Sequence, residues 1–441
     1  MNMQQYERYK DSQDAWLGRV PAGWEVRRAD FVIKSRKLQI SDGDLENMDV
    51  YHYAIPTVQT TGVGAIEEGE SINSNKLIIN EPQVLVSKLN PRKATVTIAE
   101  PHDEYLTVAS TEFVPLIPYD SEIRYLYYVW KSQKVTDRLS SFVQSVTRSH
   151  QRCEPAEITK IPWAWPTLNE QSCIADFLDR KTAEIDTLIA KKRRLLDLLA
   201  EKRTALITRA VTKGLNPDAP MKDSGIEWLG KIPAHWEVLP VKRLVYEHDG
   251  LQMGPYGSML TNLPGNGTGY KLYGQENVIS GDFSRGNRWI DEGRYEVLER
   301  YRVLDGDLVL TRKGSLGNCR IVPYGIIPGI IDSDTIRVRP CKDILLSEWA
   351  LLSLQQSAYV SEQIAMMKRG AILSGLNTSV VGSLLLVVPP KLEQKEVLKN
   401  IKGFSAAIEK QNNVVTKTIA ALQEYRSALI TNAVTGQIKV A

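Results

Sequence analysis

The sequence predicts a mixed α/β (α+β) fold in which two globular units alternate with two long helices. Two internal repeats predict this order. The segment EKRTALITRAVTKG, from Glu201, returns as EYRSALITNAVTGQ from Glu424, a shift of 223 positions. The segment KDSQDAWLGRVPAGWEV, from Lys10, returns as KDSGIEWLGKIPAHWEV from Lys222, a shift of 212. A chain duplicated in this way predicts pseudo-two-fold symmetry, with the two helices antiparallel and packed as a coiled coil.

The first long helix is expected from about Glu170 to Gly214. Residues that favour helix fill this stretch, and no Gly or Pro interrupts it. Thr167 and Glu170 have the spacing of a capping box at its start, and Gly214 followed by Pro217 is a stop signal. A helix of this length spans roughly 60 Å at about 1.5 Å per residue. It is therefore too long for one compact domain and needs a partner.

Apolar residues recur along this helix at spacings of three, four and seven, which predicts a coiled-coil seam. The shift of 223 positions carries the pattern onto the second helix. Lys192 and Arg203 also fall on the seam of the first helix, and Asn412 and Arg426 on that of the second. The predicted seam residues are Ile185, Ile189, Leu196, Leu199, Leu206 and Ala210, with Ile408, Val415, Ile419, Leu422, Leu429 and Ala433.

The repeats place four domain boundaries along the chain. The expected domains are a first globular domain at 1–166, a central helix at 167–214, a second globular domain at 215–390 and a C-terminal helix at 391–441. In the first domain we expect strands at 84–88 and 95–98 and a helix at 122–139. In the second we expect a strand at 306–312 and a helix at 347–367.

Composition indicates a globular protein of two to four domains. The chain has 441 residues, 43% of them hydrophobic and 24% charged, with a formal net charge of +3. No apolar run is long enough to cross a membrane, and the N-terminus resembles no signal peptide. The four cysteines form no CxxC pair, which predicts reduced thiols and a cytoplasmic protein.

The order of the motifs resembles the specificity subunit of Type I restriction–modification systems over the full length of the chain. The strongest elements are WLGKIPAHWEV, GPYGSML from Gly254, DLVLTRKGSLG and the two ALIT-containing helices. The first unit departs from the pattern, because it has no GPYGS segment and its turn LNPRK contains no glycine. Equivalent contacts in the two halves are therefore not assured.

The resemblance implies two target-recognition domains, each reading one half of a bipartite DNA site. It implies that the helical regions set the separation of the half-sites and dock the partners. Those partners are double-stranded DNA, two methyltransferase subunits, and restriction subunits that act as motor and nuclease. The chain itself is then expected to bind no cofactor and no metal, with S-adenosylmethionine, ATP and Mg on partner subunits. No membrane contact is expected.

Side chains able to read bases gather in turns and loops of both globular domains. Arg and Lys match guanine, and Asn and Gln match adenine. Exposed turns are rich in such residues for purely local reasons as well, so each single residue has a structural alternative. The candidates in the first domain are Lys88, Asn90, Arg92, Lys93, Arg148, His150, Gln151 and Arg152. In the second they are Tyr256, Ser258, Gln275, Arg312, Lys313, Ser315, Asn318, Arg320, Lys368, Arg369 and Asn377.

No catalytic pattern emerges from the sequence. It contains neither a G-x-x-x-x-G-K-[ST] loop nor H-E-x-x-H, and its five histidines are scattered. Glu170-Gln171 recurs as Glu393-Gln394 at the start of the second helix, which we interpret as structural. We therefore expect a non-catalytic recognition subunit. Two alternatives are a DNA methyltransferase or nuclease that acts alone, and a coiled-coil adaptor that binds only proteins.

Overall fold

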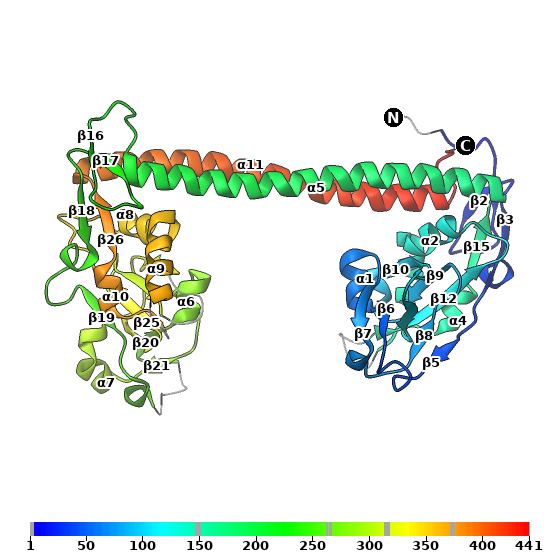
Figure 1. The fold of residues 1–441 in the computed structure, drawn as a ribbon, viewed down its shortest axis with the longest axis horizontal. Helices are drawn as coiled ribbons and strands as arrows, with labels where there is room; N and C mark the ends of the chain where they lie inside the picture. The colour runs from blue at the N-terminus through cyan, green and yellow to red at the C-terminus, as the bar shows by residue number, and fades with distance from the viewer. Residues whose placement is uncertain are drawn as a thin grey trace. The chain divides into compact units, whose positions relative to one another are not determined.

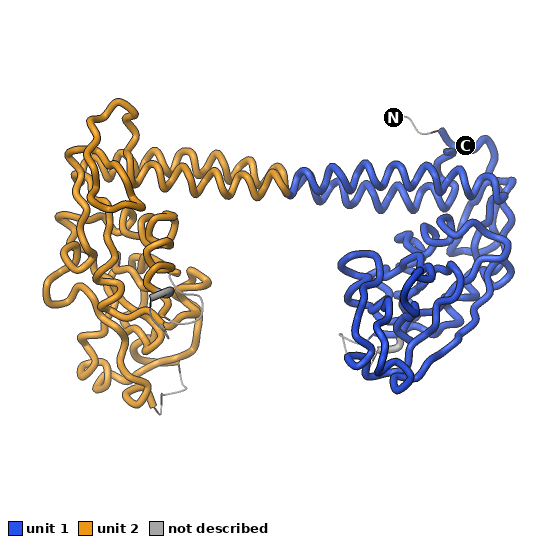
Figure 2. Tube along the Cα trace, in the orientation of Figure 1, with its two compact units in different colours: residues 1–193, 416–441 blue, residues 194–415 orange. Residues whose placement is uncertain are grey.

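The computed structural model describes residues 4–145, 151–261, 263, 267–312, 318–370 and 375–440. They form two compact units, residues 1–193 with 416–441 (unit 1) and residues 194–415 (unit 2), which Figure 2 colours separately. Two long helices, α5 (Leu168–Lys213) and α11 (Lys391–Val434), pack against each other (Figure 1). Each unit thus combines a globular part with one piece of each long helix.

The globular part of unit 1 contains two main sheets. The first has the strand order β10-β9-β12-β4 and the second β5-β8-β11-β6-β7. The strands of these sheets are β4 (Ile33–Lys34), β5 (Gln39–Ile40), β6 (Asp49–Tyr53), β7 (Ala65–Glu68), β8 (Lys76–Ile78), β9 (Gln83–Ser87), β10 (Val96–Ala99), β11 (Leu106–Ser110) and β12 (Phe113–Pro118). Short pairs complete the unit: β1 (Tyr9–Asp11) with β2 (Arg19–Pro21), β3 (Glu25–Arg28) with β15 (Pro162–Trp165), and β13 (Gln144–Ser145) with β14 (Gln151–Arg152). Its shorter helices are α1 (Ile55–Thr61), α2 (Ile123–Lys131), α3 (Gln133–Ser141) and α4 (Pro155–Thr159).

Unit 2 has the corresponding sheets, with the orders β19-β25-β22-β23 and β21-β20-β24. Their strands are β19 (Leu251–Met253), β20 (Tyr270–Tyr273), β21 (Trp289–Ile290), β22 (Leu308–Thr311), β23 (Cys319–Ile321), β24 (Gly329–Ile331) and β25 (Thr335–Val338). Short pairs join β16 (Met221–Asp223) to β17 (Lys231–Pro233) and β18 (Glu237–Pro240) to β26 (Leu385–Val388). The helices are α6 (Gln275–Ser280), α7 (Glu292–Val297), α8 (Ser347–Leu351), α9 (Ala358–Gly370) and α10 (Thr378–Ser383).

Strand register identifies equivalent positions in the two units. Antiparallel β9 and β12 place Val86 opposite Val114, and β22 and β25 place Leu310 opposite Ile336. In the second sheet of each unit, one parallel pair leads into a short helix: β6 beside β11 before α1, and β20 beside β24 before α6. In the first sheet of each unit, every residue of β9 and of β22 is buried.

Both helices expected in the globular domains are interrupted. The stretch 122–139 divides at Ser132, whose backbone is extended and whose hydroxyl accepts a hydrogen bond from the N–H of Val135. A serine that caps a new helix in this way ends the preceding one. The stretch 347–367 divides at Leu352–Gln356, a π-helical turn, followed by the extended Ser357. The expectation of single helices was wrong because apolar periodicity alone reveals neither a serine cap nor a π-helical turn.

Equivalent tryptophans join each globular part to both long helices. In unit 1 the indole N–H of Trp24 donates to Glu170 in the first turn of α5, and a Cβ on Gly436, just after α11, would lie 3.1 Å from the Trp24 ring. In unit 2 Trp236 donates to Glu393 in the first turn of α11, and Gly214, just after α5, has the same relation to the Trp236 ring. In each unit the start of one long helix therefore lies beside the end of the other, so the helices are antiparallel.

A pair of equivalent glutamines follows directly after these glutamates. The buried Gln171 accepts from the Ser121 hydroxyl (2.8 Å) and the Glu122 N–H (2.9 Å) and donates to the Pro166 carbonyl (3.0 Å). The buried Gln394 accepts from the Leu346 N–H (3.0 Å) and donates to the carbonyls of Ile344 and Pro389 (2.8 and 2.9 Å). Each amide thus connects a long helix to the residue that precedes α2 or α8.

The start of α5 departs from the expected capping box in one respect. The Thr167 hydroxyl accepts a hydrogen bond from the Glu170 N–H at 3.4 Å, as predicted. The Glu170 carboxylate, however, bonds Tyr6 and Trp24 instead of returning to the start of the helix. Among the described residues, no helix is both long and apolar enough to span a membrane.

Candidate nucleic-acid interface

Two separate candidate segments of unit 1 meet in the structure. Lys88 follows β9; its N–H donates to the carbonyl of Glu112 (3.0 Å), and its carbonyl accepts from the N–H of Cys153 (3.0 Å). The Asn90 N–H donates to the Gln151 carbonyl at 2.6 Å. The turn 88–93 and the segment 151–152 therefore form one surface. Arg148 and His150 lie outside the described residues.

Asn90 shapes the turn that carries Arg92 and Lys93. It has φ 50° and ψ 62°, a left-handed conformation that Asn tolerates better than most residues, and Pro91–Lys93 form a single 3-10 turn after it. Arg92 and Lys93 are exposed, and the Lys93 ammonium donates to the Gln59 side chain at 3.3 Å. The turn thus presents two cations to solvent.

The carboxylate of Glu112 lies near two further candidate cations, Arg152 and Lys88. Arg152 bonds it through two nitrogens at 3.0 and 3.1 Å, and the Lys88 ammonium lies 4.0 Å away. A two-point bond between guanidinium and carboxylate fixes the orientation of both groups. Sequence reasoning missed Glu112, because nothing in its local pattern distinguishes it from a surface acid.

In unit 2 Arg312 occupies the position that Lys88 has in unit 1. Its N–H donates to the Asp334 carbonyl (3.0 Å), and its carbonyl accepts from the Leu376 N–H (2.9 Å). The pattern is the one that joins Lys88 to Glu112 and Cys153. The two turns differ in sequence, yet the backbone holds a basic residue at the same point of both units.

The Arg312 side chain binds backbone, in contrast to that of Lys88. Its Nε donates to the Leu376 carbonyl at 3.0 Å, and Nη1 donates to the Ser333 carbonyl at 3.4 Å. The half-buried guanidinium thus connects the end of β22 with the segments before β25 and α10. Its remaining N–H donors can contact a ligand, since a guanidinium carries five.

The turn Asp332–Asp334 gathers further elements of unit 2. The Gly254 N–H donates to Thr335, and a Cβ at Gly254 would lie 1.8 Å from the Asp332 carbonyl oxygen, so this glycine permits a close backbone approach. Arg288 donates to the Asp332 carboxylate at 2.7 Å. Burial raises the pKa of Asp332, and Arg288 opposes that effect. The GPYGS segment therefore packs beside the residues that hold Arg312.

The remaining candidates of unit 2 have varied surroundings. Asn377 caps α10 by accepting from the Val380 N–H at 2.8 Å, and Gln275 is the first residue of α6. Arg320 lies on β23 and donates to the carbonyl of Cys319, and the Asn318 carbonyl accepts from the N–H of Thr311. Tyr256 and Ser258 are exposed beside or in the 3-10 turn Gly257–Leu260. Lys313 and Ser315 lie outside the described residues, and the side chains of Lys368 and Arg369 are not described.

The predicted seam residues lie on the inner side of the helix pair. Ile185, Ile189, Leu199, Ala210, Ile408, Val415, Leu429 and Ala433 are buried, and Leu196, Leu206, Ile419 and Leu422 are half-buried. Arg203 is exposed and bonds Gln356, so it leaves the seam. The ends of α5 also pack into the globular cores, through Ile174 and Leu178 in unit 1 and Ile207 and Val211 in unit 2.

Comparisons with known proteins agree with this architecture. Residues 21–196 match the family described as the Type I restriction modification DNA specificity domain. The chain is 22% identical to the putative type I restriction enzyme MjaX specificity subunit of Methanocaldococcus jannaschii, over 99% of this chain and 98% of the relative. It is 23% identical to the type I restriction enzyme EcoKI specificity subunit of Escherichia coli K12, over 71% of this chain and 65% of the relative.

Two solved structures share the fold. A chain from a structure of a type I R-M system aligns with a TM-score of 0.69 at 14% identity, over 94% of this chain and 98% of that one. The HsdS subunit from Thermoanaerobacter tengcongensis aligns with a TM-score of 0.53 at 15% identity, over 95% and 98%. At these identities the likeness concerns the fold.

The chain contains two equivalent β-rich units. Each unit holds a basic residue with the same backbone hydrogen bonds, and each packs on a piece of both long helices. This arrangement defines a two-part recognition scaffold. Within the described residues, no group of three or more His, Cys, Asp or Glu side chains could hold a metal ion. Residues 21–196 match the DNA specificity domain of Type I restriction–modification systems, and over its length the chain is similar to the specificity subunits of those systems.

Proposed function

We propose that the chain recognises a bipartite site on double-stranded DNA, with one half-site for each unit. The observation that supports this most directly is the duplicated position of Lys88 and Arg312, each held by the same two backbone hydrogen bonds. Side chains on such turns can reach base edges in the major groove. Because the turns carry different side chains, the two half-sites are expected to differ in sequence.

In this proposal the candidate residues named from the sequence contact the DNA. The predicted domain boundaries separate the recognition domains from the spacer. Residues 1–166 and 215–390 act as recognition domains. Residues 167–214 and 391–441 act as the spacer between them. In unit 1 the exposed Arg92 and Lys93 are available to phosphates or bases.

The spacer role can be tested by lengthening the helices. Four helix-forming residues inserted near Lys191 add about 6 Å and keep the seam on nearly the same face. DNA rises about 3.4 Å per base pair, so the methylated site should gain one or two base pairs between unchanged half-sites. Methylome sequencing of cells that express the variant with its methyltransferase measures the spacing. An unchanged spacing in an active variant would contradict this role.

A matched insertion of two residues serves as the control. It rotates the seam by about 200° at 3.6 residues per turn. This variant should lose the packing between α5 and α11 and with it the methylation, so it separates added length from mere disruption.

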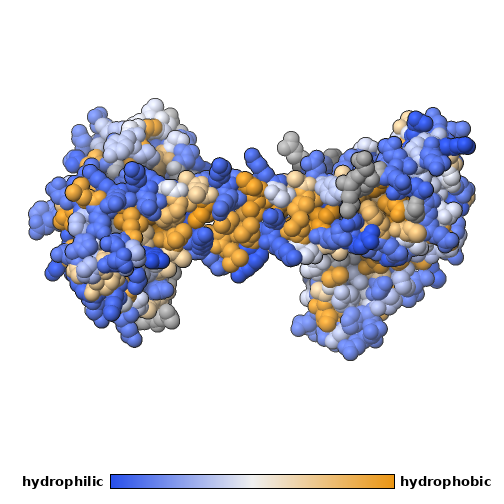
Figure 3. Space-filling view, turned by 90° about the horizontal axis from the view of Figure 1, so that it is seen from above, coloured by the Kyte–Doolittle hydropathy of each residue, from blue (hydrophilic) through white to orange (hydrophobic). Residues whose placement is uncertain are grey.

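A second apolar stripe favours docking of methyltransferase subunits on the helices. It lies next to the seam, and its exposed members are Leu188 and Tyr425 in unit 1 and Leu195, Leu198 and Val414 in unit 2. Apolar side chains are visible on the surface of the helix pair in Figure 3. On α5 the stripe residues Leu188, Leu195 and Leu198 are seven and three residues apart, a spacing that places them on one face for a partner helix. One such surface in each unit fits two methyltransferase subunits.

The docking surface is tested by placing charges on it. The double variant Leu195→Glu and Leu198→Glu should lose one of two bound methyltransferase subunits, because a carboxylate must lose its hydration on docking. Leu215→Glu, at an exposed leucine just after α5, is the control. Analytical ultracentrifugation with purified methyltransferase gives the stoichiometry, and two bound subunits in the double variant would contradict the assignment.

Catalysis belongs to the partners in this proposal. Methyltransferase subunits supply S-adenosylmethionine, and restriction subunits supply ATP- and Mg-dependent translocation and cleavage. The purified chain should therefore neither methylate nor cut DNA without partners, and activity of the chain alone would favour an independent enzyme. A complex that assembles but methylates without sequence preference would favour a protein-only adaptor.

A further inference from the structure

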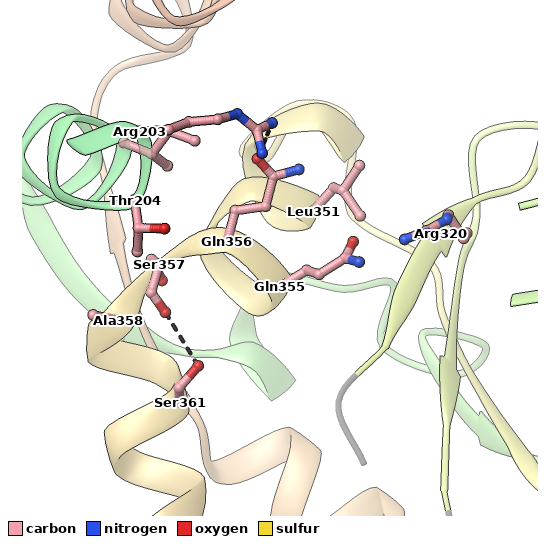
Figure 4. A pocket seen from close by; sticks show the side chains of 10 residues that line it. Arg203, Thr204, Arg320, Leu351, Gln355, Gln356, Ser357, Ala358 and Ser361 are labelled. Carbon is pink, nitrogen blue, oxygen red and sulfur yellow. Dashed lines mark hydrogen bonds between the residues drawn. The ribbon is translucent and has the colours of Figure 1, made fainter. Parts of the chain in front are cut away.

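A cavity of about 580 Å³ opens in unit 2 between α5, the start of α9 and β23 (Figure 4). The π-helical turn Leu352–Gln356 forms its floor together with Leu351. Its other walls carry polar side chains and two arginines. The lining residues are Arg203, Thr204, Ile207, Arg320, Leu351, Gln355, Gln356, Ser357, Ala358 and Ser361.

The charge of this cavity is positive and uncompensated. Arg203 and Arg320 reach it from different walls, with Gln355 and Gln356 between them (Figure 4). None of its lining residues is acidic. In the described part of the chain, Arg203 donates to the side-chain amide oxygen of Gln356 (3.2 Å) and Arg320 to the backbone carbonyl of Cys319 (2.9 Å), and neither forms an ion pair. Each guanidinium keeps several N–H donors for another acceptor.

The N-terminus of a helix adds to the positive electrostatic potential in the cavity. The 13-residue helix α9 begins at Ala358 on the wall of the cavity. The N-terminus of a helix carries partial positive charge from its unpaired N–H groups. The Ala358 N–H already donates to the Thr208 hydroxyl (3.1 Å). The helix therefore contributes its partial positive charge to the cavity, but not the Ala358 N–H as a hydrogen-bond donor.

Unit 1 contains the same junction with a different charge arrangement. Its Gln133 N–H donates to the Thr431 hydroxyl at 3.1 Å, and Thr431 is the repeat equivalent of Thr208. Arg426 is the equivalent of Arg203, and it forms an ion pair with Asp186 at 2.9 Å. The duplicated arginine is therefore neutralised in unit 1 and directed to a cavity without acids in unit 2.

We propose that this cavity binds a backbone phosphate of DNA beside the half-site of unit 2, with Arg203 and Arg320 as positioning residues. The inference rests on the proposed function. Arg320 lies on β23, the strand that follows the predicted recognition turn, so a phosphate here lies next to the bases that this turn contacts. Contacts to phosphate fix the register of a protein on DNA, whereas contacts to bases supply specificity.

The test compares Arg203→Ala, Arg320→Ala and the double variant in the assembled methyltransferase complex. Loss of the one bound phosphate in the double variant should reduce the slope of log K against log salt by about 0.9, and each single variant should reduce it by a smaller amount. The loss should be equal for cognate and scrambled duplexes, and the methylated sequence should not change. Arg193→Ala, an exposed arginine of α5 outside the cavity, should keep the wild-type slope.

Variants that keep the charge show whether misfolding, instead of a lost phosphate contact, causes the reduced slope. Arg203→Lys and Arg320→Lys keep the charge and should keep most of the slope. A slope equal to that of the wild type in the double alanine variant overturns the proposal. So does a variant that loses methyltransferase assembly at an unchanged slope, which would assign the cavity to a carboxylate of the partner.

A titration distinguishes ATP and inorganic phosphate from DNA as the ligand of the cavity. ATP and inorganic phosphate are each added to the wild-type complex and the double variant at constant ionic strength. Suppose that the double variant binds ATP more weakly but keeps the wild-type salt dependence of DNA binding. That result would assign the cavity to a nucleotide and overturn the proposal that it binds a DNA phosphate. A wild-type complex without any sequence preference would contradict the proposed function, whereas the slope difference would still support the phosphate site.

Discussion

In unit 1 Trp24 and Gln171 connect the sheets to α5, and in unit 2 Trp236 and Gln394 make the same connections to α11. The residues around these contacts have diverged. Both units nevertheless keep the Trp–Glu hydrogen bond and a buried glutamine that accepts from one backbone N–H and donates to a proline carbonyl. Basic residues at equivalent points behave differently. Lys88 faces a glutamate while Arg312 binds carbonyls, and Arg426 is paired while Arg203 is not. The junctions with the helices are thus alike, and the surfaces offered to a ligand are distinct.

Exchange of a whole recognition domain should have the largest effect. Replacing residues 30–160 with the matching segment of a relative leaves Trp24, Glu170 and Gln171 in place. Because Gln171 accepts from a backbone N–H at 122, a new sequence can make the same bond. One half-site should change completely while the other and the spacer stay. Methylome sequencing checks this, and a change in both half-sites of an assembled complex would show that the units do not act independently.

Removal of a buried glutamine tests whether the junctions are equivalent. Gln171→Ala and Gln394→Ala each delete three hydrogen bonds and leave buried partners unpaired, at a cost of about 3 kcal/mol. Hydrogen exchange should speed up around 121–131 in the first variant and around 344–351 in the second. Gln411→Ala, at an exposed position of α11, is the control. Unequal losses would mean that one junction depends on other contacts.

Arg312→Ala and Lys88→Ala should separate the two equivalent basic positions. Loss of Arg312 should cost about 1–3 kcal/mol of binding at one position of one half-site if it contacts a base. It should also speed hydrogen exchange of the Leu376 N–H, because the side chain holds that segment. Lys88→Ala should leave exchange at Cys153 unchanged. Equal weakening for all DNA sequences would instead assign Arg312 to a phosphate.

The smallest expected effect is a difference between the two units in how their stability depends on pH. Burial lowers the pKa of His52 below its ordinary 6.5, against the opposing effect of Glu67, and Lys76 lowers it further. The folded state then binds fewer protons than the unfolded state, so unit 1 loses stability as pH falls through 6.5 toward the folded pKa. Unit 2 has Leu272 in the corresponding register.

His52→Leu gives unit 1 the residue type of unit 2 at this position. Urea unfolding, followed by exchange in β6, should be less sensitive to the change from neutral to mildly acidic pH in the variant. The same sensitivity in both proteins would show that other groups cause the pH dependence.

Much of the fold could be predicted because repeats and periodicity are long-range patterns within one sequence. The long helices, the strands near 84–88 and 95–98 and the recurrence of Glu-Gln were accessible in this way. The break at Ser132 was not, because a serine cap competes with helix only when its neighbours pack, and the π-helical turn before Ser357 leaves no local pattern either.

The candidate site was predictable to a lesser extent. Residues 88–93 and 151–152 could each be selected from local polarity, but their contact depends on strand register. The role of Glu112 and the equivalence of Lys88 with Arg312 depend on three segments that meet only in the fold. Charge neutralisation of this kind has no local sequence signal. Arg203 fell on the predicted seam because helical spacing alone does not show that its side chain bonds Gln356.

The division of the chain also dictates an order of completion during synthesis. Unit 2 is one continuous segment, 194–415, whereas unit 1 needs residues 416–441 to cover Trp24 and to fill its core with Leu429 and Ala433. At roughly 5–20 residues per second, the ribosome adds those residues on the order of 10–50 s after the first 193. The part of the protein that is translated first must therefore finish last, and a chain that stops early would expose an unfinished unit 1 to proteases.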